Sequence, residues 1–216
     1  TLVTTSLLIV LGAIATLALE WGNTATLGAQ DEIVRPMTAG FLSVMTRSGG
    51  FSPVDIGEMN GSTLLVYDML MFVGGGSAST AGGIKVTTLA VLFLAAFAEA
   101  KGNNDMNAFD RKIPTDVLRL AVSITLWGAT IVATSSIIIL QLTDAPLDYV
   151  LFDVVSAFAT CGLSTGLTET LPDAGKYVLA ATMWAGRVGT VTLAAALAAS
   201  QRRQLFTRAE ERPIVG

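Results

Sequence analysis

Histidine is absent from this chain of 216 residues, and cysteine occurs once, at Cys161. Without histidine, the chain has no histidine-based acid–base catalysis, no Ser-His-Asp triad and no histidine ligand for zinc. One cysteine cannot form an internal disulfide, and with no visible base to activate it, its thiol is not an expected nucleophile. These absences argue against an enzyme, and we expect neither catalytic residues nor an organic cofactor on this chain.

Charge is also scarce, because only 14% of the residues are charged while 52% are hydrophobic and the mean hydropathy is +0.63. Soluble domains seldom have this composition, so we expect the chain to lie in a lipid bilayer. The net charge is −4 and no basic cluster occurs before the C-terminal tail, which argues against nucleic acid as a partner. The chain starts at Thr1 rather than Met, which suggests a piece of a longer polypeptide.

Uncharged or weakly charged apolar runs are long enough to cross a hydrocarbon core of about 30 Å. Two shorter apolar segments, each followed by a glycine-containing polar string, are typical of re-entrant helices that enter the bilayer without crossing it. The sequence therefore predicts an all-α membrane protein. The expected spans are 2–19, 62–98, 117–142 and 177–200, and the expected short helices are 31–45 and 147–159.

The second span contains the string FVGGGSASTAGGIKVTT at Phe72 to Thr88, which places glycines, hydroxyls and a lysine in its middle. Backbone groups inside a bilayer need hydrogen-bond partners, so an interrupted helix persists only inside protein or beside a water-filled path. We expect an interruption from Gly74 to Gly83 that lines a translocation path. Close helix packing through small residues is the alternative interpretation of the same string.

The two halves of the chain repeat one another. The first glycine loop (46–52, TRSGGFS) and the second glycine loop (160–165, TCGLST) each follow a short helix, and Gly50 aligns with Gly162 at an offset of 112 residues (162 − 50). Gly74 aligns with Gly186 at the same offset. Each half thus reads as span, short helix, glycine loop, span. Backbone carbonyls of such a loop can replace the hydration shell of a monovalent cation.

Basic residues predict the orientation, because cytoplasmic loops of membrane proteins are enriched in Lys and Arg. The connection 101–116 and the tail 201–216 are rich in basic residues, which places both in the cytoplasm together with the N-terminus of this segment. Both glycine loops then open toward the outer face, where Arg35 and Arg47 are exceptions to the rule. The expected divisions are 1–100, 101–116, 117–200 and 201–216.

Five strings, TRSGGFS, GGGSASTAGGIKV, SAFATCGLSTG, GRVGTVTL and RAEERPIVG, resemble the Trk/Ktr/HKT superfamily of potassium transporters. The resemblance covers nearly the whole chain. It implies four span–pore-helix–filter-loop–span units around a pseudo-fourfold pore, of which this chain supplies the third and fourth. It also implies an inner-membrane protein, K⁺ as the transported ion, a homodimer, and a cytoplasmic nucleotide-binding regulatory ring as partner.

The resemblance assigns roles to individual positions. Gly49 stands where many members have Ala, and Cys161 where many have Val. The implied K⁺ filter uses mainly the backbone carbonyls of Ser48, Gly49, Gly50, Thr160, Cys161 and Gly162. The implied gate, an intramembrane loop below the filter with one arginine beside it, consists of Gly74, Gly75, Gly76, Ser77, Ser79, Thr80, Gly82, Gly83, Lys85 and Arg187.

Several interpretations stay open. Arg187 either adds an electrostatic barrier on the cation path, donates to carbonyls of the interrupted helix, or reaches toward an interface. Lys85 either belongs to the gate or marks the cytoplasmic half of its span. For Asp68 and Asp153, a structural role at helix starts or interfaces is favoured over attraction of cations.

Two other function classes also remain. A potassium symporter coupled to Na⁺ or H⁺ requires a buried carboxylate or ion pair at the bilayer midplane. The clear midplane charges in this sequence are Lys85 and Arg187, which weakens the case for coupling. A non-transport membrane scaffold requires only the packing glycines and predicts indifference to substitutions in the glycine loops.

Overall fold

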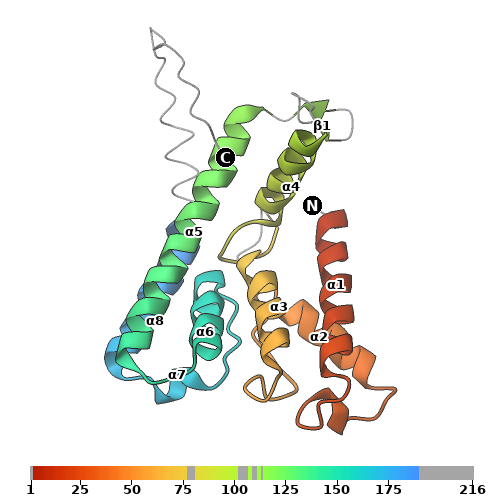
Figure 1. The fold of residues 1–216 in the computed structure, drawn as a ribbon, viewed down its shortest axis with the longest axis vertical. Helices are drawn as coiled ribbons and strands as arrows, with labels where there is room; N and C mark the ends of the chain where they lie inside the picture. Colours follow the sequence, from red (N-terminus) through yellow and green to blue (C-terminus); the bar gives the residue numbers. More distant parts are fainter. Residues whose placement is uncertain (1, 77–80, 102–106, 109–110, 113, 190–216) are drawn as a thin grey trace.

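The computed structural model describes residues 2–76, 81–101, 107–108, 111–112 and 114–189, and this part of the chain is mostly helical (Figure 1). Two short turns, η1 (Leu27–Ala29) and the π-helical η2 (Ala185–Gly189), accompany the longer elements. The α-helices are α1 (Leu2–Glu20), α2 (Arg35–Met45), α3 (Gly61–Phe72), α4 (Val86–Ala100), α5 (Thr115–Leu142), α6 (Leu147–Ala159), α7 (Leu167–Thr170) and α8 (Asp173–Trp184).

Within the described residues, α1 and α5 are the two helices long and apolar enough to cross a membrane by themselves. With 19 and 28 residues, they extend about 28 and 42 Å at 1.5 Å per residue. The interruption expected within 62–98 is present, because α3 ends at Phe72 and α4 begins at Val86. We call residues 73–85 the helix break.

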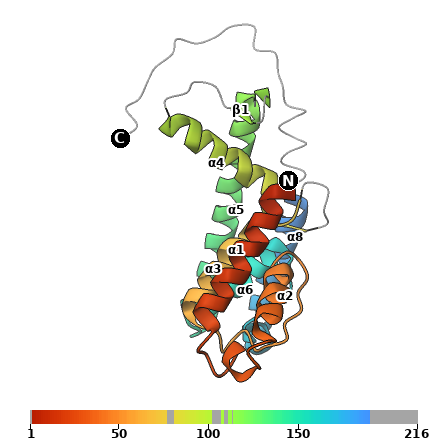
Figure 2. The ribbon, with the colours of Figure 1, turned by 90° about the vertical axis from the view of Figure 1, so that its right-hand side faces the viewer.

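The helices form two groups that meet along one interface. In the N-terminal group α1 packs against α2 and α3, and in the C-terminal group α5, α6 and α8 pack against one another. The groups meet where α3 contacts α6 and where α4 contacts α5. Figures 1 and 2 show α2, α6 and α7 toward one end of the molecule, and the start of α1 together with β1 toward the other.

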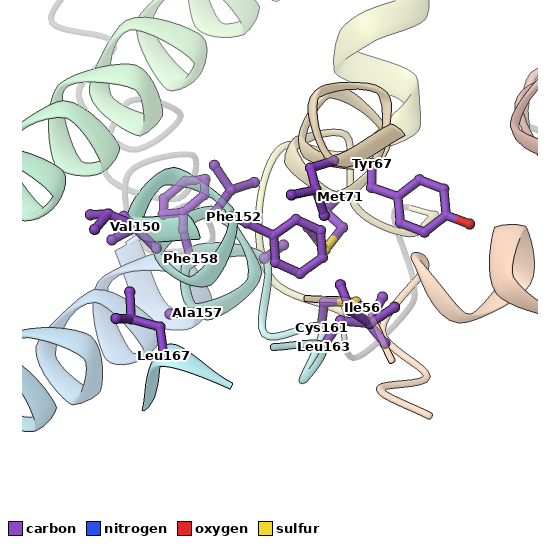
Figure 3. Packing of buried hydrophobic residues seen from close by; sticks show 14 of the residues in the cluster. Ile56, Tyr67, Met71, Val150, Phe152, Ala157, Phe158, Cys161, Leu163 and Leu167 are labelled. Carbon is purple, nitrogen blue, oxygen red and sulfur yellow. The ribbon is translucent and has the colours of Figure 1, made fainter. Parts of the chain in front are cut away.

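Helix α6 lies at the centre of this arrangement, with Val150 and all residues from Phe152 to Ala159 buried. Phe158 stacks on Phe72 at the end of α3, with 5.8 Å between the ring centroids. Figure 3 shows Phe152 and Phe158 of α6 and Met71 of α3 among the side chains of the buried cluster. The second glycine loop therefore starts from a helix that protein surrounds, which fixes its position.

Four details differ from the sequence predictions. Helix α2 begins at Arg35 rather than at residue 31, because Pro36 stands in its first turn, and α8 begins directly after Pro172, earlier than the expected 177. Helix α7 was not expected. The connection 101–116 contains a small antiparallel pair, β1 (Asn107–Ala108) and β2 (Arg111–Lys112), in a chain predicted to be all-α. Residues 190–200 of the expected fourth span and the tail 201–216 lie outside the described residues.

Candidate functional site

The two glycine loops touch one another across the interface between the two helical groups. The Ser48 hydroxyl donates to the Thr160 carbonyl oxygen at 2.9 Å, and the Cys161 thiol donates to the Met45 carbonyl oxygen at 3.2 Å. Gly50 and Gly162 also face each other, because a Cβ built on Gly162 would lie 3.3 Å from the Gly50 Cα. The six residues predicted to form the filter thus lie in two loops that contact each other.

The backbone of the two loops follows the same pattern. Positive φ angles occur at Ser48 (75°) and Gly50 (72°) in the first loop, and at Thr160 (51°) and Gly162 (97°) in the second. Such torsions are unfavourable for residues with a Cβ, so their occurrence at Ser48 and Thr160 indicates a conformation imposed by the surroundings. Positive φ at every second residue is compatible with successive carbonyls on one side of the loop, the arrangement that cation coordination by backbone oxygens requires.

A cavity of about 610 Å³ is lined by Gly50, Gly162 and residues that follow them in the chain, and its lining includes no described residue of the helix break. Gly50 and Gly162 form part of its wall, and Asp55 and Glu169 are its acidic lining residues. From the sequence, attraction of cations was the less favoured interpretation of Asp68 and Asp153. Neither of them lines this cavity, whereas Asp55 and Glu169 do.

Asp153 instead holds the chain that follows the second glycine loop. Its side chain is 4% exposed. One carboxylate oxygen accepts hydrogen bonds from the Thr165 N–H (2.9 Å) and hydroxyl (3.2 Å). The other accepts from the Ser164 hydroxyl (2.9 Å) and from the Thr168 hydroxyl (2.7 Å) and N–H (3.2 Å). These five bonds support the structural role that the sequence analysis favoured.

The two ends of the helix break, next to α3 and α4, are hydrogen-bonded to each other. We call this paired region the neck of the break. The Ile84 N–H donates to the Phe72 carbonyl at 3.1 Å, and the Val86 N–H donates to the Gly75 carbonyl at 3.3 Å. Val73 and Ile84 form an isolated parallel bridge at this neck. A Cβ on Gly74 would overlap the carbonyl oxygen of Gly82, so the neck closes only with glycine at this position.

Both glycine loops bind the helix break. From the first loop, the Arg47 Nη1 donates to the Val73 carbonyl at 2.8 Å and makes a longer contact, 3.5 Å, with the Gly74 carbonyl. From the second, the Thr160 hydroxyl accepts the Gly82 N–H at 2.9 Å. Within the break, the Lys85 ammonium donates to the Ala81 carbonyl. Predicted filter and predicted gate are therefore in direct contact.

Arg187 lies in η2 with an exposed side chain. It is close enough to Lys85 for the two positive charges to repel each other. Its donation to carbonyls of the break stays a prediction. Ser77, Ser79 and Thr80, which were predicted as gate residues, lie outside the described residues.

Arg47 was not predicted from the sequence as a contact of the break. The available signal was a charged residue inside a glycine loop expected at membrane depth, where a charge is costly and normally has a specific partner. It was treated only as an exception to the distribution of basic residues. The hydroxyl of Thr160 was also missed, because only its carbonyl had been considered.

The structure describes a mostly helical chain with two helices long and apolar enough to cross a membrane, and comparison with known proteins gives its family. The family model TrkH, described as a cation transport protein, matches residues 1–205. The chain therefore belongs to the TrkH family of cation transport proteins, whose members are transporters and not enzymes.

Two similar proteins are named as potassium uptake proteins. Ktr system potassium uptake protein B of Vibrio alginolyticus is 35% identical over 197 residues, covering 91% of this chain and 43% of that protein. Ktr system potassium uptake protein B of Bacillus subtilis (strain 168) is 36% identical over 203 residues, covering 91% of this chain and 45% of that protein. The chain thus spans less than half the length of these relatives.

A solved structure has the same fold. The crystal structure of the potassium transporter TrkH from Vibrio parahaemolyticus matches with a TM-score of 0.72 at 18% sequence identity. The match covers 91% of this chain and 42% of that protein chain. At this identity the match shows the fold alone.

Proposed function

We propose that this chain is part of a potassium uptake protein and that its two glycine loops select K⁺ by backbone carbonyl coordination. The observation that carries the proposal is the repeated backbone of the loops, with positive φ at Ser48 and Gly50 and again at Thr160 and Gly162. The contact between Gly50 and Gly162 supports it, because both loops then face one axis. K⁺ is the transported substrate, and it moves down its electrochemical gradient.

Two loops alone do not surround an ion, so the filter requires two more. The surroundings of the short helices support this. Helix α6 is buried from Phe152 to Ala159, whereas α2 leaves Met37 80% and Phe41 41% exposed. In the proposed arrangement residues 1–100 and 117–200 are two of four units around a pseudo-fourfold pore. The other two units belong to the remainder of a full-length protein.

The helix break is the proposed gate. It lies directly against both glycine loops, through Arg47 and Thr160, and none of its described residues lines the cavity. Among the described residues of the break, backbone pairing joins the two ends of the segment. An irregular segment at this position can block or clear the ion path with a small movement. Lys85 belongs to this gate by its bond to Ala81, and Arg187 adds positive charge beside it.

Orientation and partners complete the proposal. The start of α1 and the connection with β1 lie at the same end of the molecule (Figure 1), as a common cytoplasmic location requires. That end carries the basic connection 101–116. We assign this end of the molecule to the cytoplasm and the protein to the inner membrane of the cell. There a nucleotide-binding regulatory ring contacts the connection 101–116 and the tail 201–216. The full-length protein is a homodimer.

The test is K⁺ and Na⁺ flux in proteoliposomes, with this chain alone and with the same chain inside its full-length polypeptide. K⁺-selective flux of the full-length form alone is the expected result. Gly162→Ser in the full-length form should lower the K⁺ preference over Na⁺, because a side chain at a φ of 97° distorts the loop. Unchanged flux and preference in this variant would contradict the filter and favour a scaffold role for the loops.

One observation favours coupled transport as a second candidate. Asp68 in α3 is 6% exposed, and its Oδ1 has no hydrogen-bond partner in the described part of the chain. A buried carboxylate one turn before the break is the kind of group that a symporter uses to bind H⁺ or Na⁺. Coupling predicts that an inward proton or Na⁺ gradient drives K⁺ accumulation and that Asp68→Asn abolishes this accumulation while passive K⁺ flux persists. No accumulation in the unsubstituted protein would reject it.

A further inference from the structure

Arg47 lies between the first glycine loop and the helix break and uses only one of its three nitrogen atoms. Nη1 donates to the Val73 carbonyl at 2.8 Å. Nε and Nη2 are buried and have no hydrogen-bond partner in the described residues. Buried donors without partners are unfavourable, and an arginine with most of its fork unused is a poor device for stability alone. Its position therefore points to a role in the action of the protein.

Thr160 binds the other end of the break. Its hydroxyl accepts the Gly82 N–H at 2.9 Å, while Arg47 binds the residues that leave α3. Thr160 has a left-handed backbone (φ 51°) at the end of α6, a helix buried by its neighbours, so its hydroxyl is firmly placed. Ser48, next to Arg47, donates to the Thr160 carbonyl at 2.9 Å. The two attachment points thus belong to one connected frame.

The described residues of the break, 73–76 and 81–85, are joined to one another and to this frame by separate hydrogen bonds. The neck of the break is closed by the bond from the Ile84 N–H to the Phe72 carbonyl. The contacts of Arg47 and Thr160 are hydrogen bonds that join described residues of the break to the glycine loops. A displacement of the break must therefore break them. The unused donors of Arg47 could then bind other carbonyls of the displaced chain, which lowers the cost of leaving the first arrangement.

We propose that Arg47 and Thr160 are positioning residues that form a two-point latch, which holds the helix break in its non-conducting place against the glycine loops. This inference rests on the proposed function, in which the break is the gate. Opening requires release of at least one of the two points. Neither residue needs to bind K⁺ through its side chain for this role.

The experiment uses the full-length protein in proteoliposomes with K⁺ and Na⁺ flux as readouts. Arg47→Gln removes the charged donor, and Thr160→Val removes the hydroxyl while keeping the branched Cβ. Arg35→Gln is the matched control for the first, because Arg35 donates to backbone carbonyls of the outer loop, those of Trp21, Gly28 and Gln30. Thr130→Val is the control for the second, since its hydroxyl bonds only within α5.

Both latch variants should raise K⁺ flux. We expect a rise of about tenfold for Arg47→Gln, which loses a hydrogen bond from a charged group, and a smaller rise for Thr160→Val, which loses a bond between neutral groups. Thr160→Val changes no charge, so a rise shared by both variants reports a released break rather than a removed electrostatic barrier. Arg47→Gln should keep its K⁺ to Na⁺ ratio, because a gate released below the filter passes both ions in proportion. Thr160→Ser keeps the hydroxyl and should return flux toward that of the unsubstituted protein.

Flux equal to that of the controls in either latch variant overturns the two-point latch. A loss of flux in both overturns it as well, because such a result shows support of folding or of the filter. If Arg47→Gln does not fold, Arg47→Lys replaces it, and a flux rise is again required because one ammonium cannot reproduce the guanidinium geometry. Absence of K⁺-selective flux in the unsubstituted protein would instead reject the proposed function itself, so the two failures are distinguishable.

Discussion

Gly50 packs against the carbonyl oxygen of Cys161 so closely that a Cβ on Gly50 would lie 2.7 Å from that oxygen. Gly50 is in the first glycine loop and Cys161 in the second, so each loop sets the space available to the other. The φ angle of Gly50, 72°, is a second reason for glycine at this position, because a residue with a Cβ rarely adopts this torsion. Packing and backbone torsion therefore select the same residue.

Gly50→Ala should disturb both loops and lower the ratio of K⁺ to Na⁺ flux in the full-length protein by about tenfold or more. The torsion alone costs about 1–2 kcal/mol, and the Cys161 carbonyl must also move. The control is Gly40→Ala, because no atom lies within 4 Å of a Cβ at that helical position. A ratio as high in Gly50→Ala as in Gly40→Ala would show that the loop does not set selectivity.

Asp153→Asn should weaken the chain behind the second glycine loop. The carboxylate accepts five hydrogen bonds from Ser164, Thr165 and Thr168, and an amide NH₂ in place of one oxygen would face their donors. We expect a loss of about 1–3 kcal/mol in the free energy of unfolding and a lower K⁺ to Na⁺ ratio. Thermal unfolding in detergent and flux in proteoliposomes measure the two effects. Asp144→Asn, at an exposed position, is the control, and equal behaviour of the two variants would contradict the assigned role.

Glu20→Gln should destabilise the loops that join the C-terminal end of α1 to the start of α3. Glu20 is fully buried, and its carboxylate accepts hydrogen bonds from the Asn23 amide, the Thr26 hydroxyl, the Asn60 N–H and the Thr63 hydroxyl. Both oxygens face donors only, so a side-chain amide leaves at least one donor unpaired. The expected loss is about 1–3 kcal/mol, seen as a lower midpoint of thermal unfolding.

Glu32→Gln is the control for Glu20→Gln, because Glu32 is exposed and its substitution removes the same charge. The ratio of K⁺ to Na⁺ flux should stay near that of the unsubstituted protein in the Glu20 variant, because Glu20 bonds none of the residues in the two glycine loops. A stability equal to that of Glu32→Gln would contradict the network.

The order of the helical elements could be predicted because it depends on composition along the chain. Glycine and hydroxyl residues in an apolar run indicated the break between Phe72 and Val86, and the offset of 112 residues aligned the two loops. Prolines shifted two helix starts, at Pro36 and Pro172, by amounts that local sequence could have suggested.

The contacts within the candidate site could not be predicted in the same way. Two arginines stood near predicted elements, and only the fold shows that Arg47 donates to the break at Val73. Asp153 and Thr165 are brought together by the return of the chain over the end of α6. Such pairings depend on the direction of side chains after packing, which neither spacing nor hydrophobicity specifies.

The most direct test of the account is the position of bound cations in crystals of the full-length protein grown with Tl⁺ in place of K⁺. Anomalous scattering locates Tl⁺ independently of the protein chain. The account predicts Tl⁺ between the two glycine loops, coordinated by backbone oxygens of Ser48 to Gly50 and Thr160 to Gly162. Transport of Tl⁺ by the same protein, with Tl⁺ bound elsewhere and none between these loops, would contradict the central claim that they form the filter.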